Sequence, residues 1–488
     1  MDPLKICLVS SEVAPFAKTG GLADVAAALA RQLHRKKHDV RLLMPFYRRV
    51  RDGREFTPVP ELQDIPLRLG DRTYYFSIST AKLPKSQLKV WFVRCPELFD
   101  RDGIYTQDSD EHVRFALLTR AALETAQWTS WAPDIVHCND WHTSLAPLYL
   151  RTLYAWDKLF ANTRSVLTIH NIGYQGVFGS DKLRDLGLES EKRLLYQEDL
   201  NEGRVNFLKT GILYANWLTT VSRTYAREIQ GDEHGMGLQG LLRQRADALT
   251  GIVNGVDYDD WNPRKDAHLA ERYSERDLRG KEACKKALCE KLGLDFAPRA
   301  ALFGVVSRLT VQKGFELLPD ILPVLLHRED VRLVVLGSGE ERYENYFHWL
   351  AGAFKRKVAF RAGFDDALAH QIEAGADMFL MPSRYEPCGL NQMYSLRYGT
   401  VPIVRRTGGL ADTVQEWNPA TGEGTGFLFD AFTSEALFGS LQRALGVWRD
   451  EGAWQRLVQN GMAQDFSWEH QVEEYLALYR KLAPVPAG

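Results

Sequence analysis

The sequence lacks the features typical of membrane proteins and nucleic-acid-binding proteins. No apolar run approaches the ~18 residues needed to span a bilayer. Charge of neither sign prevails, because 61 Lys and Arg stand against 63 Asp and Glu. Such a balance creates no strong field toward DNA or an anionic lipid surface. We therefore expect a small or neutral partner, with no nucleic acid and no membrane.

Cysteine is also sparse and scattered. The chain has 6 cysteines and no C-x-x-C pair, which argues against a disulfide framework or a zinc ribbon. The first residues, MDPLKICLVSSEVAPFAKTGG, hold an apolar core too short for a secretory signal peptide. We expect reduced thiols and a cytoplasmic location.

What is present is a repeated order of strand and helix. At 488 residues the chain exceeds one ordinary core, since domains usually run to about 100–200 residues. Short apolar runs recur, each followed by turn residues and then a stretch with helical period, which favours parallel sheets covered on both faces. The sequence predicts an α/β protein with two doubly wound, Rossmann-like domains. The strand candidates are KICLVS, DVRLLMP, KVWFV, DIVHC, SVLTIH and WLTTVS, then ALFGVVSR, VRLVVLG, KVAFRAG, MFLMPS and VPIVRR.

The segment GIVNGVDYDDWNP separates the two sets of strands, and its Asn-Gly, Asp and Pro residues indicate turns. We place a hinge there, at 253–263. The predicted N-terminal domain is then 1–252 and the C-terminal domain 264–464. An amphipathic helix at 465–488 is expected to pack across both domains.

The string TGGLAD occurs twice, at Thr19 to Asp24 and at Thr407 to Asp412. Each copy follows a predicted strand and opens a helix, where glycines allow close approach and the helix N-terminus favours a phosphate. Ligands of open α/β sheets bind beyond the carboxyl ends of the strands. We expect two facing domains with an interdomain cleft lined by both turns. The alternative is that TGG is only a good strand-to-helix turn, because glycine-rich strings are weak signals alone.

Charged residues follow two strands of the second set. SRLTVQKG supplies Arg308 and Lys313, which suit a diphosphate, although a solvated helix start is the simpler interpretation. SRYEPCGLNQMY places Glu386 beside the amides that follow Cys388, although an acid at a helix start is also common. Cys388 is expected to pack or to offer its amide rather than to act as a nucleophile, since no His is adjacent.

Polar residues also follow two strands of the first set. HCNDWH carries His137, Asp140 and His142, and TIHN carries His170 and Asn171, all suited to sugar hydroxyls. A metal interpretation of the first group is disfavoured, because neighbouring positions on an extended turn do not point together. We expect neither a metal nor a cofactor.

Taken together, these strings closely resemble the bacterial glycogen synthases and plant starch synthases of glycosyltransferase family 5. The resemblance covers nearly the full length. It implies the GT-B arrangement, with an acceptor-side N-terminal domain and a C-terminal domain that binds the nucleotide sugar. It also implies transfer of glucose from ADP-glucose to the non-reducing end of an α-1,4-glucan, with retention. It rests on KTGGLADV, HCNDWH, TIHNIGYQG, GIVNGVD, SRLTVQKG and SRYEPCGLNQMYSLRYGTVPIVRRTGGLADTV.

The resemblance also implies roles for individual residues. Lys18, Gly20 and Gly21 would meet the diphosphate and glucose of the donor, while Arg308 and Lys313 would hold its phosphates. His170 and Glu386 would lie at the transferred glucose, and Phe364 would stack on the nucleobase. The remaining substrate-binding candidates, near the sugar, the acceptor or the hinge, are Asp140, His142, Asn171, Asn254, Cys388, Gly389, Leu390, Thr407 and Gly408.

One departure from the wider clan concerns a second carboxylate. Many relatives carry another Glu eight residues after the first, where this chain has Tyr394. Retention would arise from a covalent intermediate on Glu386 or from attack on the face that the phosphate leaves, and the resemblance favours the second route. The acceptor is expected to be glycogen or a maltooligosaccharide. The alternatives are a UDP-glucose-dependent enzyme with another acceptor and a non-catalytic glucan- or nucleotide-binding relative. The oligomeric state is left open.

Overall fold

The computed structural model describes residues 2–51 and 54–483, which form two compact units. Among the described residues, the first unit comprises 2–51, 54–221, 226–255 and 468–483, and the second comprises 222–225 and 256–467. The domain boundaries drawn from the sequence stay a prediction. The helix predicted at 465–488 is observed as α17 (Trp468–Leu482) within the first unit, and positions 484–488 of that prediction lie outside the described residues.

The first unit is built on a sheet whose larger part is parallel. Its strand order includes β6-β2-β1-β7-β8-β11-β12, the doubly wound order in which the chain reverses its direction of growth between β1 and β7. These strands are nearly continuous apolar runs because helices cover both faces. The parallel strands are β1 (Lys5–Val9), β2 (Asp39–Pro45), β6 (Lys89–Arg94), β7 (Ile135–Asn139), β8 (Arg164–Ile169), β11 (Trp217–Thr220) and β12 (Leu249–Gly251).

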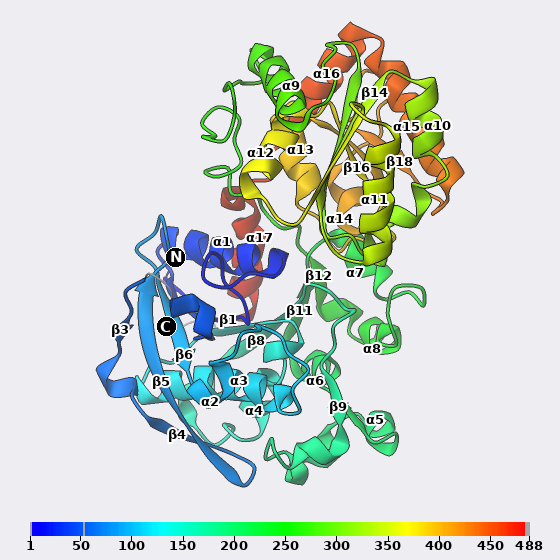
Figure 1. The fold of residues 1–488 in the computed structure, drawn as a ribbon. Coiled ribbons are helices and arrows are strands. Elements are labelled where there is room, and N and C mark those ends of the chain that lie inside the picture. Colours follow the sequence, from blue (N-terminus) through cyan, green and yellow to red (C-terminus); the bar gives the residue numbers. More distant parts are fainter. Residues whose placement is uncertain (1, 52–53, 484–488) are drawn as a thin grey trace. The chain divides into compact units, whose positions relative to one another are not determined.

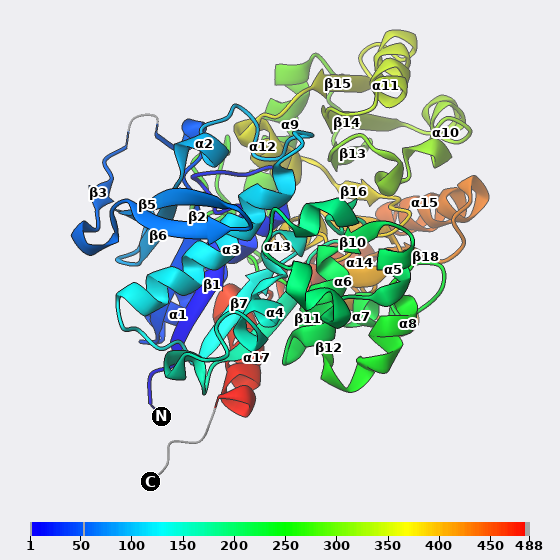
Figure 2. The ribbon, with the colours of Figure 1, turned by 90° about the horizontal axis from the view of Figure 1, so that it is seen from below.

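Three antiparallel strands extend this sheet and were not predicted. β5 (Arg72–Lys82) pairs antiparallel with β6, and both β3 (Thr57–Pro58) and β4 (Ile65–Leu69) pair antiparallel with β5. β4 alternates buried and exposed residues, as expected for a strand with one solvated face. Figure 2 shows β3 and β5 at this edge of the sheet. A short ribbon of β9 (Val177–Gly179) and β10 (Arg204–Asn206) lies elsewhere in the unit.

The helix α17 closes the first unit from the far end of the chain. It packs on α1 (Gly21–Arg35), where Gln32 Nε2 donates to Glu469 Oε1 over 2.8 Å. Tyr479 also bonds to His137 of β7 over 2.6 Å. Figure 1 shows the red α17 against the blue α1. The other α-helices of this unit are α2 (Pro96–Phe99), α3 (Glu111–Trp128), α4 (Ala146–Arg151), α5 (Gln197–Asn201), α6 (Phe207–Tyr214) and α8 (Gln239–Gln244), and α7 (Arg223–Glu228) begins in the second unit.

The second unit has an entirely parallel sheet of order β15-β14-β13-β16-β17-β18. This is again the Rossmann order, with the reversal between β13 and β16. Every strand segment predicted from the sequence is found in one of the two sheets, which confirms the fold class. The strands are β13 (Ala301–Val306), β14 (Val331–Gly337), β15 (Val358–Ala362), β16 (Met378–Met381), β17 (Val401–Arg405) and β18 (Phe427–Phe429).

Both faces of this sheet are covered, so the second unit has two cores. Phe303 and Val335 face a cluster that includes residues of α10, α11, α15 and α16, whereas Leu302 and Val334 face one that includes residues of α9 and α12. Figure 1 shows α10 and α11 on one side of the strands and α12 on the other. No helix within the described residues is both long and apolar enough for a membrane span. The helices are α9 (Arg279–Leu292), α10 (Leu322–Arg328), α11 (Glu341–Ala353), α12 (Asp366–Gly375), α13 (Asn391–Tyr398), α14 (Gly408–Thr413), α15 (Ser434–Trp448) and α16 (Glu451–Met462).

Candidate functional site

In the second unit, two predicted residues meet at the reversal point of the sheet. Lys313 lies in the loop after β13 and Glu386 in the loop after β16, and Nζ is 2.6 Å from Oε2. Both side chains are largely shielded, with 18% and 6% of their surface exposed. Ser383 Oγ donates to the same carboxylate oxygen over 3.0 Å. A paired ammonium and carboxylate thus lie where ligands of such sheets bind.

A glycine allows this approach. Gly314 has φ +72°, and a Cβ built there would lie 1.9 Å from the carbonyl oxygen of Pro382. The loop after β13 therefore runs directly against the loop after β16, and Arg384 N donates to Gln312 O over 2.9 Å. Any larger residue at position 314 would separate the loops that carry Lys313 and Glu386.

The second TGGLAD copy packs against the backbone around Glu386. Gly408 has φ +45°, and a Cβ there would lie 1.9 Å from Glu386 O. A Cβ on Gly409 would lie 2.1 Å from Cys388 O, and Gly409 N donates to Glu386 O over 3.0 Å. Thr407 is buried as well. Gly408 and Gly409 thus allow close packing against the backbone of Glu386 and Cys388. The sequence predicts instead that these glycines let a ligand approach the turn.

The segment from Cys388 to Leu390 is fixed by hydrogen bonds from a buried side chain of α13. Cys388 is buried, Gly389 has φ +73°, and Leu390 directly precedes α13. Gln392, also buried, donates to the carbonyls of Cys388 and Gly389 and to Thr413 Oγ1, each over 3.1 Å. Sequence reasoning missed Gln392, whose only signal was a side-chain amide at the second position of the helix that follows Glu386.

Arg308 and Phe364 lie on exposed loops at the same edge of this sheet. Arg308 follows β13, and Phe364 follows β15 with 80% of its surface exposed. The loops after β13 and β14 are joined through a bridge between Leu309 and Gly339. Arg308 and Phe364 thus share with the Lys313–Glu386 pair the edge of the sheet at which β13, β15 and β16 end.

In the first unit, a buried carboxylate organises the first TGGLAD copy. Glu12, which sequence reasoning missed, accepts hydrogen bonds from the amide and hydroxyl of Thr19 and from Tyr105 OH. A Cβ on Gly20 would meet nothing within 4 Å, so this turn faces open space. The only sign of this role in the sequence is that Glu12 is a single acid in the apolar segment after β1. Gly21 begins α1, and Lys18 Nζ pairs with Asp24 Oδ2 over 2.9 Å at the surface.

Asp140 and His170 form a second cluster at the reversal point of the first sheet. Asp140 has φ +54°, and its Oδ1 accepts the amide of His170 over 2.7 Å. Burial raises the pKa of Asp140 to about 7. Burial lowers the pKa of His170 to about 3, so its ring is neutral. Because Asn139 Nδ2 donates to Val9 O, its Oδ1 accepts from His170 Nε2 over 2.8 Å, which leaves Nδ1 as the acceptor of that ring.

His142 and His137 have different surroundings. His142 is buried in an aromatic wall, with ring centroids 4.7 Å from Tyr105 and 4.1 Å from Trp141. Its Nδ1 has no partner among the described atoms, and burial lowers its pKa well below the usual value. His137 bonds to Thr168 and to α17 through its two ring nitrogens, so it is structural.

Asn171, Asn254 and Tyr394 complete the predicted set. Asn171 Oδ1 accepts Gly173 N over 3.0 Å and shapes the turn after β8. Asn254 is buried after β12, and its Oδ1 has no partner among the described atoms. Tyr394 stacks on Trp261 with centroids 3.9 Å apart, so the position where many relatives carry a second Glu serves packing here.

Two models of known protein families match this chain, one in each unit. A family model described as starch synthase catalytic domain matches residues 5–244, and one described as glycosyl transferases group 1 matches 293–461. A glycogen synthase from Anaeromyxobacter dehalogenans is 46% identical over 99% of this chain and 100% of its own.

Two solved structures are also similar. The catalytic domain of starch synthase IV from Arabidopsis thaliana, bound to ADP and acarbose, has a TM-score of 0.89 and 34% identity over 99% of both chains. A sucrose-phosphate synthase from Thermosynechococcus elongatus has a TM-score of 0.60 and 16% identity over 98% of both chains, which shows a shared GT-B fold. The chain therefore belongs to the family of bacterial glycogen synthases and starch synthases, which are glycosyltransferases.

Proposed function

We propose that the chain transfers glucose from ADP-glucose to the non-reducing end of an α-1,4-glucan, with retention at the anomeric carbon. The observation that carries this proposal is the Lys313–Glu386 pair, 2.6 Å apart at the reversal point of the second sheet. The ADP in the Arabidopsis relative supports an adenine nucleotide as the leaving group.

Breaking the bond between glucose and phosphate creates an anionic diphosphate and a sugar with cationic character. We assign Lys313 and Arg308 to the diphosphate, the first as a partly shielded point charge and the second as a fork of donors. Groups aimed at charge that develops in the transition state give the largest single contribution in many enzymes. Cys388, Gly389 and Leu390 are assigned to the phosphate side of the glucose, and Thr407 and Gly408 support that loop.

Glu386 is assigned to positioning rather than to nucleophilic attack. Its Oε2 already accepts from Lys313 and Ser383, and a carboxylate held by a cation and a hydroxyl is a weaker nucleophile. The remaining oxygen can bind a sugar hydroxyl or face the cationic anomeric carbon. The acceptor then attacks on the face that the phosphate leaves, and a phosphate oxygen takes its proton.

Residues of the first unit are assigned to the sugars and the donor. The neutral ring of His170 offers an acceptor nitrogen to a glucose hydroxyl, and Asp140 fixes the loop that carries it. Lys18 presents a cation to the donor, Gly20 an unobstructed backbone, and Gly21 the start of α1. His142, Asn171 and Asn254 supply further polar atoms for the glucan or the sugar.

A donor and acceptor comparison tests this function. The purified chain is incubated with ADP-, UDP- or GDP-glucose and with glycogen or maltose, and both the nucleotide released and the glucan formed are measured. We expect transfer from ADP-glucose to glycogen, with α-1,4 linkages visible by NMR in the product. Preference for UDP-glucose, or tight ADP-glucose binding without turnover, would contradict the proposal.

Phe364 provides a sharper test of the nucleobase assignment. Replacing it with alanine should raise KM for ADP-glucose and the Kd for ADP about 5- to 150-fold, since stacking of a base on an aromatic ring is worth about 1–3 kcal/mol. The kcat should change little. Trp349→Ala removes another exposed aromatic of the second unit and serves as the control. Equal effects of the two substitutions would remove Phe364 from the donor site.

A further inference from the structure

A cluster of metal-binding side chains lies in the second unit around α12, the helix that begins two residues after Phe364. His268, Asp366 and His370 each offer one donor atom, and these atoms all lie within 4.8 Å of one another. Asp366 and His370 are four residues apart on α12, so both project from one face of that helix. His268 comes from the segment before α9, and its ring centroid lies 4.9 Å from that of His370.

The buried histidine of this cluster is already oriented. Its Nδ1 donates to Asp266 Oδ2 over 2.7 Å, which leaves Nε2 as the ring nitrogen for an external ligand. Trp261 stacks on the same ring at 3.8 Å with an interplanar angle of 9°, and this contact fixes the ring plane. A histidine that binds a metal almost always donates its other nitrogen to a carboxylate or a carbonyl in this way.

The carboxylate of the cluster has no capping duty. Asp365, not Asp366, caps α12, because the side chain of Asp365 accepts Leu368 N over 2.9 Å. Asp366 and His268 are both exposed, so their side chains can rotate toward a bound ion. Donors around tetrahedral zinc lie about 3.4 Å apart, given Zn–N distances of about 2.1 Å. Modest rotation of the side chains of His268 and Asp366 would bring the ligand atoms from within 4.8 Å of one another to this spacing.

We propose that His268, Asp366 and His370 bind one divalent transition-metal ion of the zinc class, with water in the fourth position. Two imidazoles and one carboxylate suit zinc, cobalt or nickel, whereas magnesium and calcium prefer ligand sets made of oxygen. Asp266 acts behind His370 as the orienting carboxylate. The six cysteines are all buried, so the described thiols do not compete for the ion.

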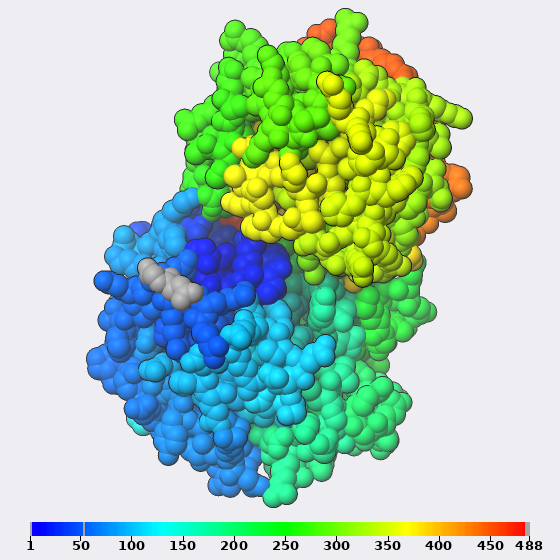
Figure 3. Space-filling model, in the orientation of Figure 1, coloured from blue at the N-terminus to red at the C-terminus, as the bar shows by residue number. Residues whose placement is uncertain are grey.

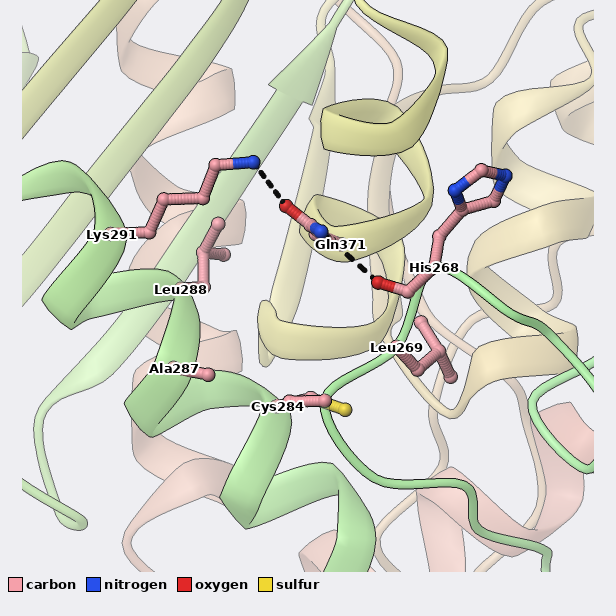
Figure 4. Close-up of a pocket in the computed structure, with 8 residues that line it drawn as sticks. His268, Leu269, Cys284, Ala287, Leu288, Lys291 and Gln371 are labelled. Carbon is pink, nitrogen blue, oxygen red and sulfur yellow. Dashed lines mark hydrogen bonds between the residues drawn. The ribbon is translucent and has the colours of Figure 1, made fainter.

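The ion would tie the segment around His268 to α12. The two also line a pocket of about 170 Å³ beside α9, where Gln371 donates to His268 O over 3.0 Å. Figure 4 shows the backbone of His268 at this pocket while its ring points away from Cys284 and Leu288. Figure 3 shows the yellow segment that includes α12 at the surface, beside the green segment that includes α9. The metal is thus expected to stiffen one wall of the pocket without entering it.

Metal titration of the full, untagged chain tests this site. After treatment with a chelator and its removal, zinc binding is measured by calorimetry, and cobalt binding by the visible absorption of a tetrahedral Co²⁺ centre. We expect one site per chain and a higher Tm with zinc. His268→Ala and Asp366→Asn should each weaken zinc binding at least about 100-fold, beyond the 10–100-fold typical of outer-shell changes.

The controls separate this site from adventitious binding. His470→Ala removes another exposed histidine, in α17, and should leave zinc affinity unchanged. Circular dichroism confirms that the two exposed-site variants fold, and neither variant alters a residue assigned to glucosyl transfer. The proposal is overturned if the unaltered chain shows no saturable binding. Unchanged affinity in both His268→Ala and Asp366→Asn would overturn it as well.

Discussion

Replacing Lys313 with methionine is expected to lower kcat for glucosyl transfer roughly 100- to 1,000-fold, because one preorganised donor at such a site is worth about 3–4 kcal/mol. The side chain lies 2.6 Å from Glu386 and is only 18% exposed, so its charge acts with little screening. Methionine keeps most of the volume and removes the charge. Radiolabelled glucose transferred to glycogen gives kcat directly, and KM is expected to change less.

Two further variants show how Lys313 acts. If it served only to hold Glu386, the double variant with Glu386→Gln would be no slower than Glu386→Gln alone. We expect an additional loss in the double variant, because the developing diphosphate charge stays unpaired. Lys355→Met, at an exposed lysine after α11, is the matched control and should retain full activity. Equal rates for Lys313→Met and Lys355→Met would refute the assignment.

Replacing Lys285 with methionine is expected to destabilise the second unit by about 3–5 kcal/mol, because the substitution leaves a buried carboxylate without its cation. Lys285 Nζ lies 2.7 Å from Asp377 Oδ2, with 5% and 10% of the two side chains exposed. Burial raises the pKa of Asp377, while the charge of Lys285 opposes that rise. The ammonium also donates to Ala300 O over 2.7 Å, so the loss leaves more than one acceptor unpaired.

The neighbouring residue supplies a control for this prediction. Lys286 is exposed and lies 4.0 Å from Glu290 one turn along α9, a surface pair worth about 0.5 kcal/mol or less. Calorimetric unfolding of Lys285→Met and Lys286→Met should differ clearly in Tm. Adding Asp377→Asn to Lys285→Met is expected to restore part of the stability, since the amide carries no charge. A Lys285→Met protein as stable as Lys286→Met would show that the buried pair contributes nothing.

Most of the parallel strands were predictable because burial on both faces makes them continuous apolar runs. The short parallel strands β12 and β18, of three residues each, were not predicted. The antiparallel addition β3, β4 and β5 was missed. β5, with the sequence RTYYFSISTAK, mixes polar and apolar residues, and several of its buried positions are Ser or Thr, so it does not form a continuous apolar run. The two TGGLAD copies also have different neighbours, which their shared sequence does not indicate. Gly20 meets open space, whereas Gly408 and Gly409 lie against the backbone of Glu386 and Cys388.

Residues whose partners lie far away in the sequence could not be predicted from local patterns. Glu12 could be suspected only as an isolated acid, since its partner Tyr105 lies 93 positions away. The pairing of His370 with Asp266 spans 104 positions, and no local spacing indicates it. Lys313 and Glu386 were found because strand ends of a parallel sheet meet at one edge, although their direct pairing also depends on Gly314.

Because α17 belongs to the first unit, that unit cannot finish folding until residues 468–482 have been synthesised. That unit is assembled from segments at both ends of the sequence, since residues 468–482 pack on α1 and bond to His137. During synthesis the ribosome therefore releases the whole second unit before the last helix of the first becomes available. Until then the side of α1 that packs on α17 stays uncovered, so the first unit is the last to be completed although its first strands are made first.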